Sequence, residues 1–114
     1  MLTPFSAAVI KVIKSIPPGK VSSYGRVAAE AAILAGLSEK SGSGARQVAR
    51  LLHSSSKKYA LPWHRVINSR GYISLPFPES EEQKALLLSE GIKFLPGDRV
   101  DFEKFGWNFS CVKF

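Results

Sequence analysis

Two strong helix stops in the first half of the chain constrain the fold more than any other feature. Pro17-Pro18-Gly19 forms the first stop, and Gly36 followed by the polar, glycine-rich run 37–44 forms the second. Proline lacks the amide hydrogen that a helix interior needs, and glycine readily adopts the left-handed backbone found just past a helix end. The first half of the chain is therefore predicted to form separate short helices joined by turns.

The segments between these stops have the apolar spacing and the capping residues of amphipathic helices. In the first segment Thr3 is the expected N-cap, and the apolar residues at helical spacing are Phe5, Val9, Ile10, Ile13 and Ile16. The second segment, residues 21–36, is rich in alanine and has Ser22 or Ser23 as its N-cap. A third helix is predicted over residues 43–56, with Ser43 as its cap.

The third predicted helix carries arginines on one face. Val48, Leu51 and Leu52 form its inward stripe, whereas Arg46 and Arg50 are i, i+4 neighbours on another face. A helix, a turn and a second helix with arginines fit a helix-turn-helix motif, although the connection is longer than the usual turn of about three or four residues. The alternative at this point is a simple helical hairpin.

The second half of the chain is predicted to contain one more helix and little β structure. Residues 79–91 form this fourth helix, with Ser80 and Gln83 as a capping box and a glycine just past its end. Residues 68–71 form a turn, residues 72–78 are extended, and the aromatic tail holds at most one or two short strands. The pattern therefore predicts a mainly α fold.

Positive charge is concentrated in one part of the chain. The net charge is +7 and the sequence pI is about 9.8. Residues 1–78 contain eleven basic residues and two acidic ones, whereas residues 79–114 contain five basic and seven acidic residues. A basic region of this kind indicates a polyanionic partner, most simply nucleic acid. The alternative is a solvated basic surface without a specific partner.

Several classes of protein are excluded by features that the sequence lacks. No apolar run approaches about 20 residues, so no membrane span is expected, and the N-terminal segment has no secretory pattern. The single cysteine, Cys111, excludes an internal disulfide framework and a cysteine-based zinc site. We therefore expect an intracellular protein with no metal and no cofactor.

The run LPWHRVINSRG, residues 61–71, is the strongest candidate for a site. His64 has the character of a general base, but its neighbour Trp63 carries no nucleophilic atom. Cys111 lies in the aromatic tail, and residues 1–78 offer only two carboxylates for a Ser-His-Asp set. The run therefore has the surroundings of a reaction site but not its nucleophile.

The same residues are suited to binding a nucleic-acid base. Aromatic faces such as those of Trp63 and Tyr24 stack on bases, and an arginine such as Arg46 can fill the gap that an extruded base leaves. The alternative is that both aromatic residues belong to the core.

Four blocks of the sequence resemble a known family in their order and spacing. They are IPPGKVSSYGRVA, GARQVARLL, PWHRVINSRG and LLLSEGI, and they cover roughly residues 5–94. They are similar to the DNA-binding domain of the O6-alkylguanine-DNA alkyltransferases, whose third block reads Pro-Cys-His-Arg with a cysteine that takes the alkyl group. Trp63 stands in that place here, which resembles the alkyltransferase-like proteins that bind alkylated DNA without transferring the group. The resemblance implies a winged-helix-like single domain over residues 1–114 with a helix-turn-helix motif.

The resemblance also implies roles for individual residues. Tyr24 matches the tyrosine that acts on the phosphate of the swung-out nucleotide, and Arg46 matches the arginine that enters the base stack through the minor groove. Gln47 and Arg50, on the same predicted helix, are expected to contact the DNA as well. The residues expected to line the lesion pocket are Tyr24, Pro62, Trp63, His64, Val66, Ser69 and Leu75.

Two further residues are expected to be structural beside the pocket, namely Asn68 and Glu90. In the enzymes the counterparts of His64 and Glu90 activate the thiolate through water. Without a thiol, this pair is expected to hold the pocket together.

Three departures from the family pattern concern the DNA contact. Ala49 stands where the family usually has glycine, and the loop before Arg46 is longer than is common. The glycine-rich stretch after the turn is replaced, so the pocket lid at residues 75–77 differs and is expected to be wider.

The function implied by the resemblance is non-enzymatic recognition of O6-alkylguanine in double-stranded DNA, by minor-groove contact and base flipping, followed by transfer of the lesion to nucleotide excision repair proteins. A monomer in the cytoplasm and nucleoid, or in the nucleus of a eukaryote, is expected. The alternatives are an active alkyltransferase using Cys111, a weak glycosylase, or a generic helix-turn-helix regulator.

Overall fold

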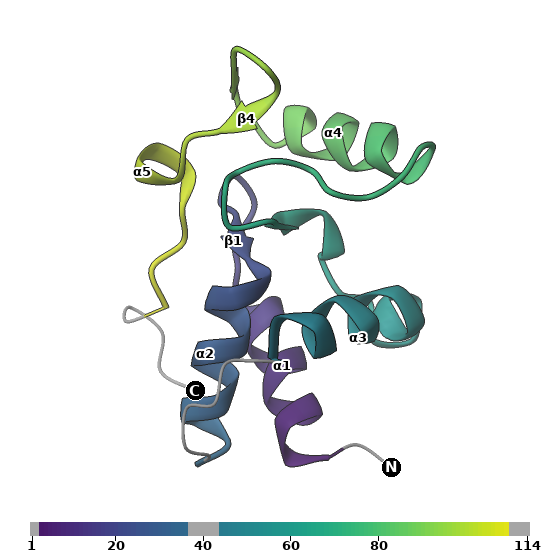
Figure 1. Cartoon of the computed structure of the whole chain (residues 1–114), viewed down its shortest axis with the longest axis vertical. Coiled ribbons are helices and arrows are strands. Elements are labelled where there is room, and N and C mark those ends of the chain that lie inside the picture. The colour runs from purple at the N-terminus through teal and green to yellow at the C-terminus, as the bar shows by residue number, and fades with distance from the viewer. Residues whose placement is uncertain (1–2, 37–43, 110–114) are drawn as a thin grey trace.

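The computed structural model describes residues 3–36 and 44–109, and this part of the chain is mostly helical (Figure 1). The three long helices in the lower half of the view are α1 (Pro4–Lys14), α2 (Tyr24–Leu34) and α3 (Gly44–Tyr59). The upper half contains α4 (Glu79–Ser89) and the short α5 (Phe102–Phe105). The predicted mainly α, winged-helix-like fold with little β structure is confirmed.

The first two helices begin and end where their capping residues predict. The Thr3 side chain accepts a hydrogen bond from the Ser6 amide at 3.1 Å, and the Ser23 side chain accepts one from the Arg26 amide at 3.1 Å. Each bond satisfies an amide that has no partner within its own helix. Gly36 follows α2 with φ of +73°. The predicted cap of α3, Ser43, lies outside the described residues.

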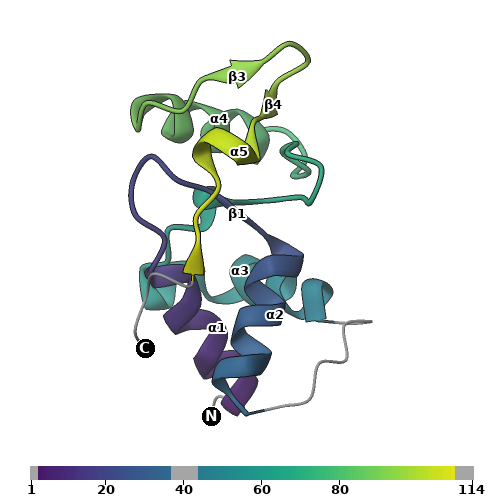
Figure 2. The same cartoon turned by 90° about the vertical axis from the view of Figure 1, so that its left-hand side faces the viewer.

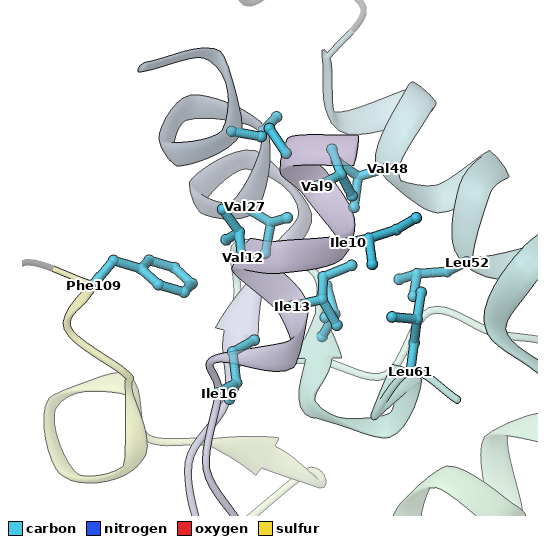
Figure 3. Close-up of a cluster of buried hydrophobic side chains, with 14 residues drawn as sticks. Val9, Ile10, Val12, Ile13, Ile16, Val27, Val48, Leu52, Leu61 and Phe109 are labelled. Carbon is cyan, nitrogen blue, oxygen red and sulfur yellow. The ribbon is translucent and has the colours of Figure 1, made fainter. Parts of the chain in front are cut away.

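The main core lies where α1 packs against α2 and α3 (Figure 3). The buried side chains labelled there are Val9, Ile10, Val12, Ile13, Ile16, Val27, Val48, Leu52, Leu61 and Phe109. The apolar spacing of α1 and α3 therefore predicted their packed faces correctly. These faces turn inward because burial of each large aliphatic side chain contributes about 1.5–3 kcal/mol. Phe5 and Leu51 pack against this cluster and are partly buried.

A short pair of parallel strands joins the helical core to the run LPWHRVINSRG, residues 61–71. Strand β1 (Ser22–Ser23) pairs with β2 (Val66–Ile67), so that Ser22 lies opposite Val66. β1 leads directly into α2, and β2 follows the 3-10 helix η1 (Trp63–Arg65). Because the carboxyl ends of parallel strands lie at the same edge, this pairing brings the start of α2 to the segment that follows residue 67.

The C-terminal part forms a hairpin and a short helix above the core. Strands β3 (Phe94–Leu95) and β4 (Arg99–Val100) are antiparallel, as the prediction of one or two short strands in the tail allows. α5 was not predicted. Figure 2 shows the hairpin and α4 together at the end of the molecule away from the lower parts of α1 and α2.

The capping box predicted for α4 is wrong. The helix begins at Glu79, so Ser80 lies inside its first turn, and no side chain caps the helix at Pro78. The Gln83 side chain, which the box would have turned back to the helix start, is 1% exposed and bonds to η1 and β2 instead. A tertiary hydrogen bond has thus replaced a local one.

α3 also extends further than predicted, to Tyr59, and His53 is exposed on its surface. Among the described helices, none combines the length and the apolar character that crossing a membrane requires.

Candidate nucleic-acid interface

The outer face of α3 is basic. Arg46 and Arg50 are exposed one turn apart, while Val48 and Leu52 on the opposite side are buried in the core. Gln47 and Ala49 are exposed on the same outer surface. The sequence of α3 contains no acidic residue and places Lys57 and Lys58 in the last turn. The face therefore presents positive charge from end to end, as contact with phosphates requires.

Tyr24 is the first residue of α2 and lies at the edge formed by β1 and β2. Its side chain is partly buried against the main core, and the Ser74 side chain lies near its hydroxyl. Burial raises the pKa of the Tyr24 phenol above its usual 10, and the nearby Ser74 side chain opposes this only in part. The hydroxyl is therefore protonated at neutral pH and remains able to donate a hydrogen bond.

Trp63 opens η1 and packs against the same core as Tyr24. Its ring meets the His64 ring edge-on, with centroids 6.1 Å apart and an interplanar angle of 84°. Pro62 precedes it and is partly exposed, whereas Val66 at the far end of η1 is fully buried. Both predicted aromatic residues thus pack on the main core, and both are only partly buried.

Asn68 shapes the turn that follows β2. Its side-chain oxygen accepts hydrogen bonds from the amides of Arg70 at 3.0 Å and Tyr72 at 2.9 Å. Ser69 is exposed on the same turn. Leu75 lies partly buried in the segment that leads from this turn to α4.

Glu90 forms the centre of a polar cluster beneath η1. One of its carboxylate oxygens lies 2.7 Å from His64 Nε2 and 2.7 Å from a terminal nitrogen of Arg65, and the other accepts from the Gly19 amide at 3.2 Å. The three side chains are only 12–15% exposed. Arg65 also donates to the Ile16 carbonyl at 2.9 Å. The cluster therefore ties η1 both to the end of α4 and to the loop after α1.

Arg65 was not predicted to have a role. Its position in the chain held a signal, because a permanently charged side chain in an otherwise apolar stretch requires a counter-charge when it is buried. Nothing in the sequence identifies Glu90 as that counter-charge, since the two are 25 residues apart.

The cluster sets the charge of Glu90. Burial raises the pKa of its carboxyl group, but hydrogen bonds from Arg65, His64 and the Gly19 amide, together with the charge of His64, outweigh burial and lower the pKa from 4.5 to about 2. Glu90 is therefore ionised throughout the physiological range. A carboxylate held in this way orients His64, because one ring nitrogen is committed to it.

Gln83 holds the backbone of η1 in place. Its side-chain nitrogen donates to the carbonyls of His64 at 3.1 Å and Val66 at 3.0 Å. Its side-chain oxygen is buried and has no partner among the described residues. The buried Gln83 amide thus gives α4 a second attachment to the segment that carries Trp63, besides the one at Glu90.

Replacement of Gln83 by leucine is expected to lower the free energy of unfolding by about 1–2 kcal/mol, because two buried carbonyls lose their donor. Loss of the unpartnered oxygen in the same change offsets part of the cost. Urea unfolding followed by tryptophan fluorescence measures the effect, with Glu82→Ala on the exposed side of the same helix as the control. Equal stability of the two variants would contradict this role for Gln83.

The clearest hollows lie away from these residues. One, of about 350 Å³, lies between α2 and the chain near Trp107, and another, of about 190 Å³, lies between α4 and the β3–β4 hairpin. Neither is lined by Tyr24 or Trp63. The lesion pocket around Trp63 therefore stays a prediction.

Comparison with known proteins gives a consistent result. The family described as 6-O-methylguanine DNA methyltransferase, DNA binding domain, matches residues 4–92. The chain belongs to this family, among its alkyltransferase-like proteins. A DNA base-flipping protein of Escherichia coli (strain K12) is 37% identical over 105 residues, which are 92% of this chain and 75% of the relative. Alkyltransferase-like protein 1 of Schizosaccharomyces pombe is 37% identical over 91 residues, which are 78% and 77% of the two chains.

A solved structure of an alkyltransferase-like protein has the same fold. It is S. pombe Atl1 in complex with damaged DNA containing O6-carboxymethylguanine, with a TM-score of 0.72 and 31% identity, covering 95% of this chain and 98% of that one. The family match ends at Ile92, so the β3–β4 hairpin and α5 lie beyond it.

Proposed function

We propose that this protein recognises O6-alkylguanine in double-stranded DNA without transferring the alkyl group. The observation that carries the proposal is Trp63, which stands where the resembling enzymes have their reactive cysteine and packs on the same core as Tyr24. Tryptophan offers no nucleophile but provides a flat apolar surface for a base. His64 is held by Glu90 rather than by a group that it could activate. The relatives named for base flipping and for damaged DNA support the same conclusion.

In the proposed complex the outer face of α3 enters the minor groove. Arg46 fills the gap left by the extruded guanine, while Gln47 and Arg50 contact the DNA on either side. Base extrusion costs a few kcal/mol, and less for a base whose pairing is weakened by O6-alkylation. An inserted arginine and stacking of about 1–3 kcal/mol per base offset this cost.

The flipped base is proposed to lie against Trp63, with the backbone near Val66 reading its edge and Leu75 on the other side. Pro62, His64 and Ser69 complete the proposed lining, and Tyr24 acts on the adjoining phosphate. Each CH2 of the alkyl group that is buried against this aromatic wall contributes about 0.8 kcal/mol to the free energy of binding.

The biological setting is part of the proposal. Residues 1–114 act as a single DNA-binding domain and as a monomer, in the nucleoid or in the nucleus, and the bound lesion passes to nucleotide excision repair proteins. The uneven distribution of charge supports DNA as the first partner, because the excess of positive charge lies before residue 79.

The proposal is tested by competition binding together with an intact-mass measurement. We expect a duplex with one O6-methylguanine to bind at least ten-fold more tightly than the unmodified duplex, and the protein mass to stay constant after prolonged incubation. Equal affinity for the two duplexes would identify a generic DNA-binding module. A gain in protein mass equal to the alkyl group would identify an alkyltransferase, and release of free base from the DNA would identify a glycosylase.

A further inference from the structure

Phe77 is the most exposed of the large apolar side chains in the described part of the chain. Its exposed fraction is 79%, compared with 67% for Ile33, 51% for Leu88 and 40% for Tyr72. An aromatic side chain held in water gains free energy when a partner covers it. A single exposed apolar residue is common on protein surfaces, so the argument depends on where Phe77 lies and how it is held.

The segment that carries Phe77 is attached to the proposed lesion site. At its start, the Asn68 amide donates to the Tyr72 carbonyl at 3.1 Å, and the Tyr72 amide donates to the Asn68 side chain at 2.9 Å. Further along, the Ser74 side chain lies near the hydroxyl of Tyr24. Phe77 is three residues beyond Ser74, so its backbone lies within about 10 Å of that of Ser74. It therefore belongs to the surroundings of the proposed pocket.

The other side of the segment is fixed to α4. The Ser80 amide donates to the Pro76 carbonyl at 3.0 Å, and the Glu81 amide donates to the Pro78 carbonyl at 3.1 Å. Proline rings also restrict the backbone on both sides of Phe77. Figure 1 shows the segment running below α4 to the N-terminal end of that helix. Phe77 is thus presented on a restrained backbone, which lowers the entropy lost when a ligand covers it.

The charges around Phe77 indicate what kind of group covers it. The first turn of α4 exposes three carboxylates, Glu79, Glu81 and Glu82, within five residues of Phe77. Negative charge on the residues that follow Phe77 opposes the approach of a phosphate or any other anion. An apolar ring beside carboxylates is instead compatible with a neutral, apolar group. In DNA that carries an O6-alkylguanine, the alkyl substituent is such a group.

We propose that Phe77 forms the outer wall of the lesion site, and that with the neighbouring carboxylates it selects neutral, apolar O6 substituents over anionic ones of the same size. This inference rests on the proposed function, because it assigns a class of adduct to that site. Phe77 lies in the lid, residues 75–77, where the sequence departs from the family pattern. The altered lid would therefore determine which adducts this protein prefers.

The test compares two adducts of the same shape. O6-isobutylguanine and O6-carboxymethylguanine have side groups with the same number and branching of heavy atoms, but only the second is charged. We expect the wild-type protein to bind the isobutyl duplex at least ten-fold more tightly than the carboxymethyl duplex. Phe77→Ala should weaken isobutyl binding by 5- to 20-fold and leave the carboxymethyl and unmodified duplexes within two-fold. The combined E79Q, E81Q and E82Q variant should reduce the ratio of the affinities for the isobutyl and carboxymethyl duplexes by at least three-fold.

Leu88→Ala is the matched control, because it removes another exposed apolar side chain near the far end of α4 and should change none of these affinities. An equal loss for all three duplexes in Phe77→Ala would make Phe77 a general DNA contact and overturn the inference, as would no loss at all. Failure of the wild-type protein to prefer any alkylated duplex over the unmodified one would instead reject the proposed function. Since Phe77 is exposed, its replacement is expected to leave the thermal unfolding temperature unchanged. This measurement checks that the variant is folded.

Discussion

Replacement of Arg46 by alanine is expected to weaken binding to a duplex with O6-methylguanine by roughly 30- to 150-fold, or about 2–3 kcal/mol. In the proposed complex the guanidinium fills the stack after the guanine has left. The variant should remain folded, because Arg46 is exposed on α3 while the adjacent core residue Val48 is untouched. Fluorescence anisotropy with labelled modified and unmodified duplexes measures both affinities.

Charge alone does not account for the expected size of this effect. Lys11→Ala removes the same charge from the exposed side of α1 and should change binding only a few-fold. Arg46→Lys keeps the charge without the planar group and should recover only part of the lost affinity. If Arg46→Ala and Lys11→Ala weakened binding equally, Arg46 would be one phosphate contact among others and the proposed base replacement would be wrong.

The helices could be predicted because their determinants are local. Thr3 and Ser23 cap α1 and α2 by bonds that span three residues, and Gly36 follows α2 with the backbone conformation that favours glycine. Val48 and Leu52 are four residues apart and share the buried face of α3. Each of these features is decided within one or two turns, so a window of sequence contains all the information needed.

The framework of the site could not be predicted, because it depends on contacts between distant segments. Glu90 bonds to the Gly19 amide 71 residues earlier and to Arg65 25 residues earlier. The strands β1 and β2 have two residues each, which is too short for an alternating pattern to be recognised. Gln83 shows the conflict directly: its position fits a local capping box, but a buried site for its amide beneath η1 prevails.

The candidate site itself was accessible only through the four resembling blocks. Tyr24 and Trp63 are 39 positions apart, and composition alone does not distinguish a stacking aromatic from a core one. The structure shows that both pack on the main core and that both retain accessible surface. In the proposed site, this packing would make Trp63 a rigid apolar wall.

Glu90→Gln is expected to lower the free energy of unfolding at pH 7 by about 3 kcal/mol. The shift of the Glu90 pKa from 4.5 to about 2 corresponds to roughly this amount, at about 1.36 kcal/mol per pH unit. The side chain is only 14% exposed, so screening by solvent is limited. Glutamine keeps the shape but not the charge, and the buried Arg65 guanidinium then lacks its counter-charge. Urea unfolding at a series of pH values measures the loss, with Glu81→Gln as an exposed control on α4.

The pH dependence separates the charge of Glu90 from its packing. Because the folded protein holds the carboxyl pKa below its unfolded value, the ionised form stabilises the fold fully above about pH 4.5, and this stabilisation is lost as the pH falls toward 2. The difference between wild type and Glu90→Gln should therefore be constant from pH 7 to about pH 5 and shrink steadily below that. A difference of the same size at pH 3 and pH 7 would show that the carboxylate acts through shape alone. Since Glu90 bonds to His64 and Arg65, a charge-dependent result would show that ionised Glu90 stabilises η1, the element that begins at Trp63.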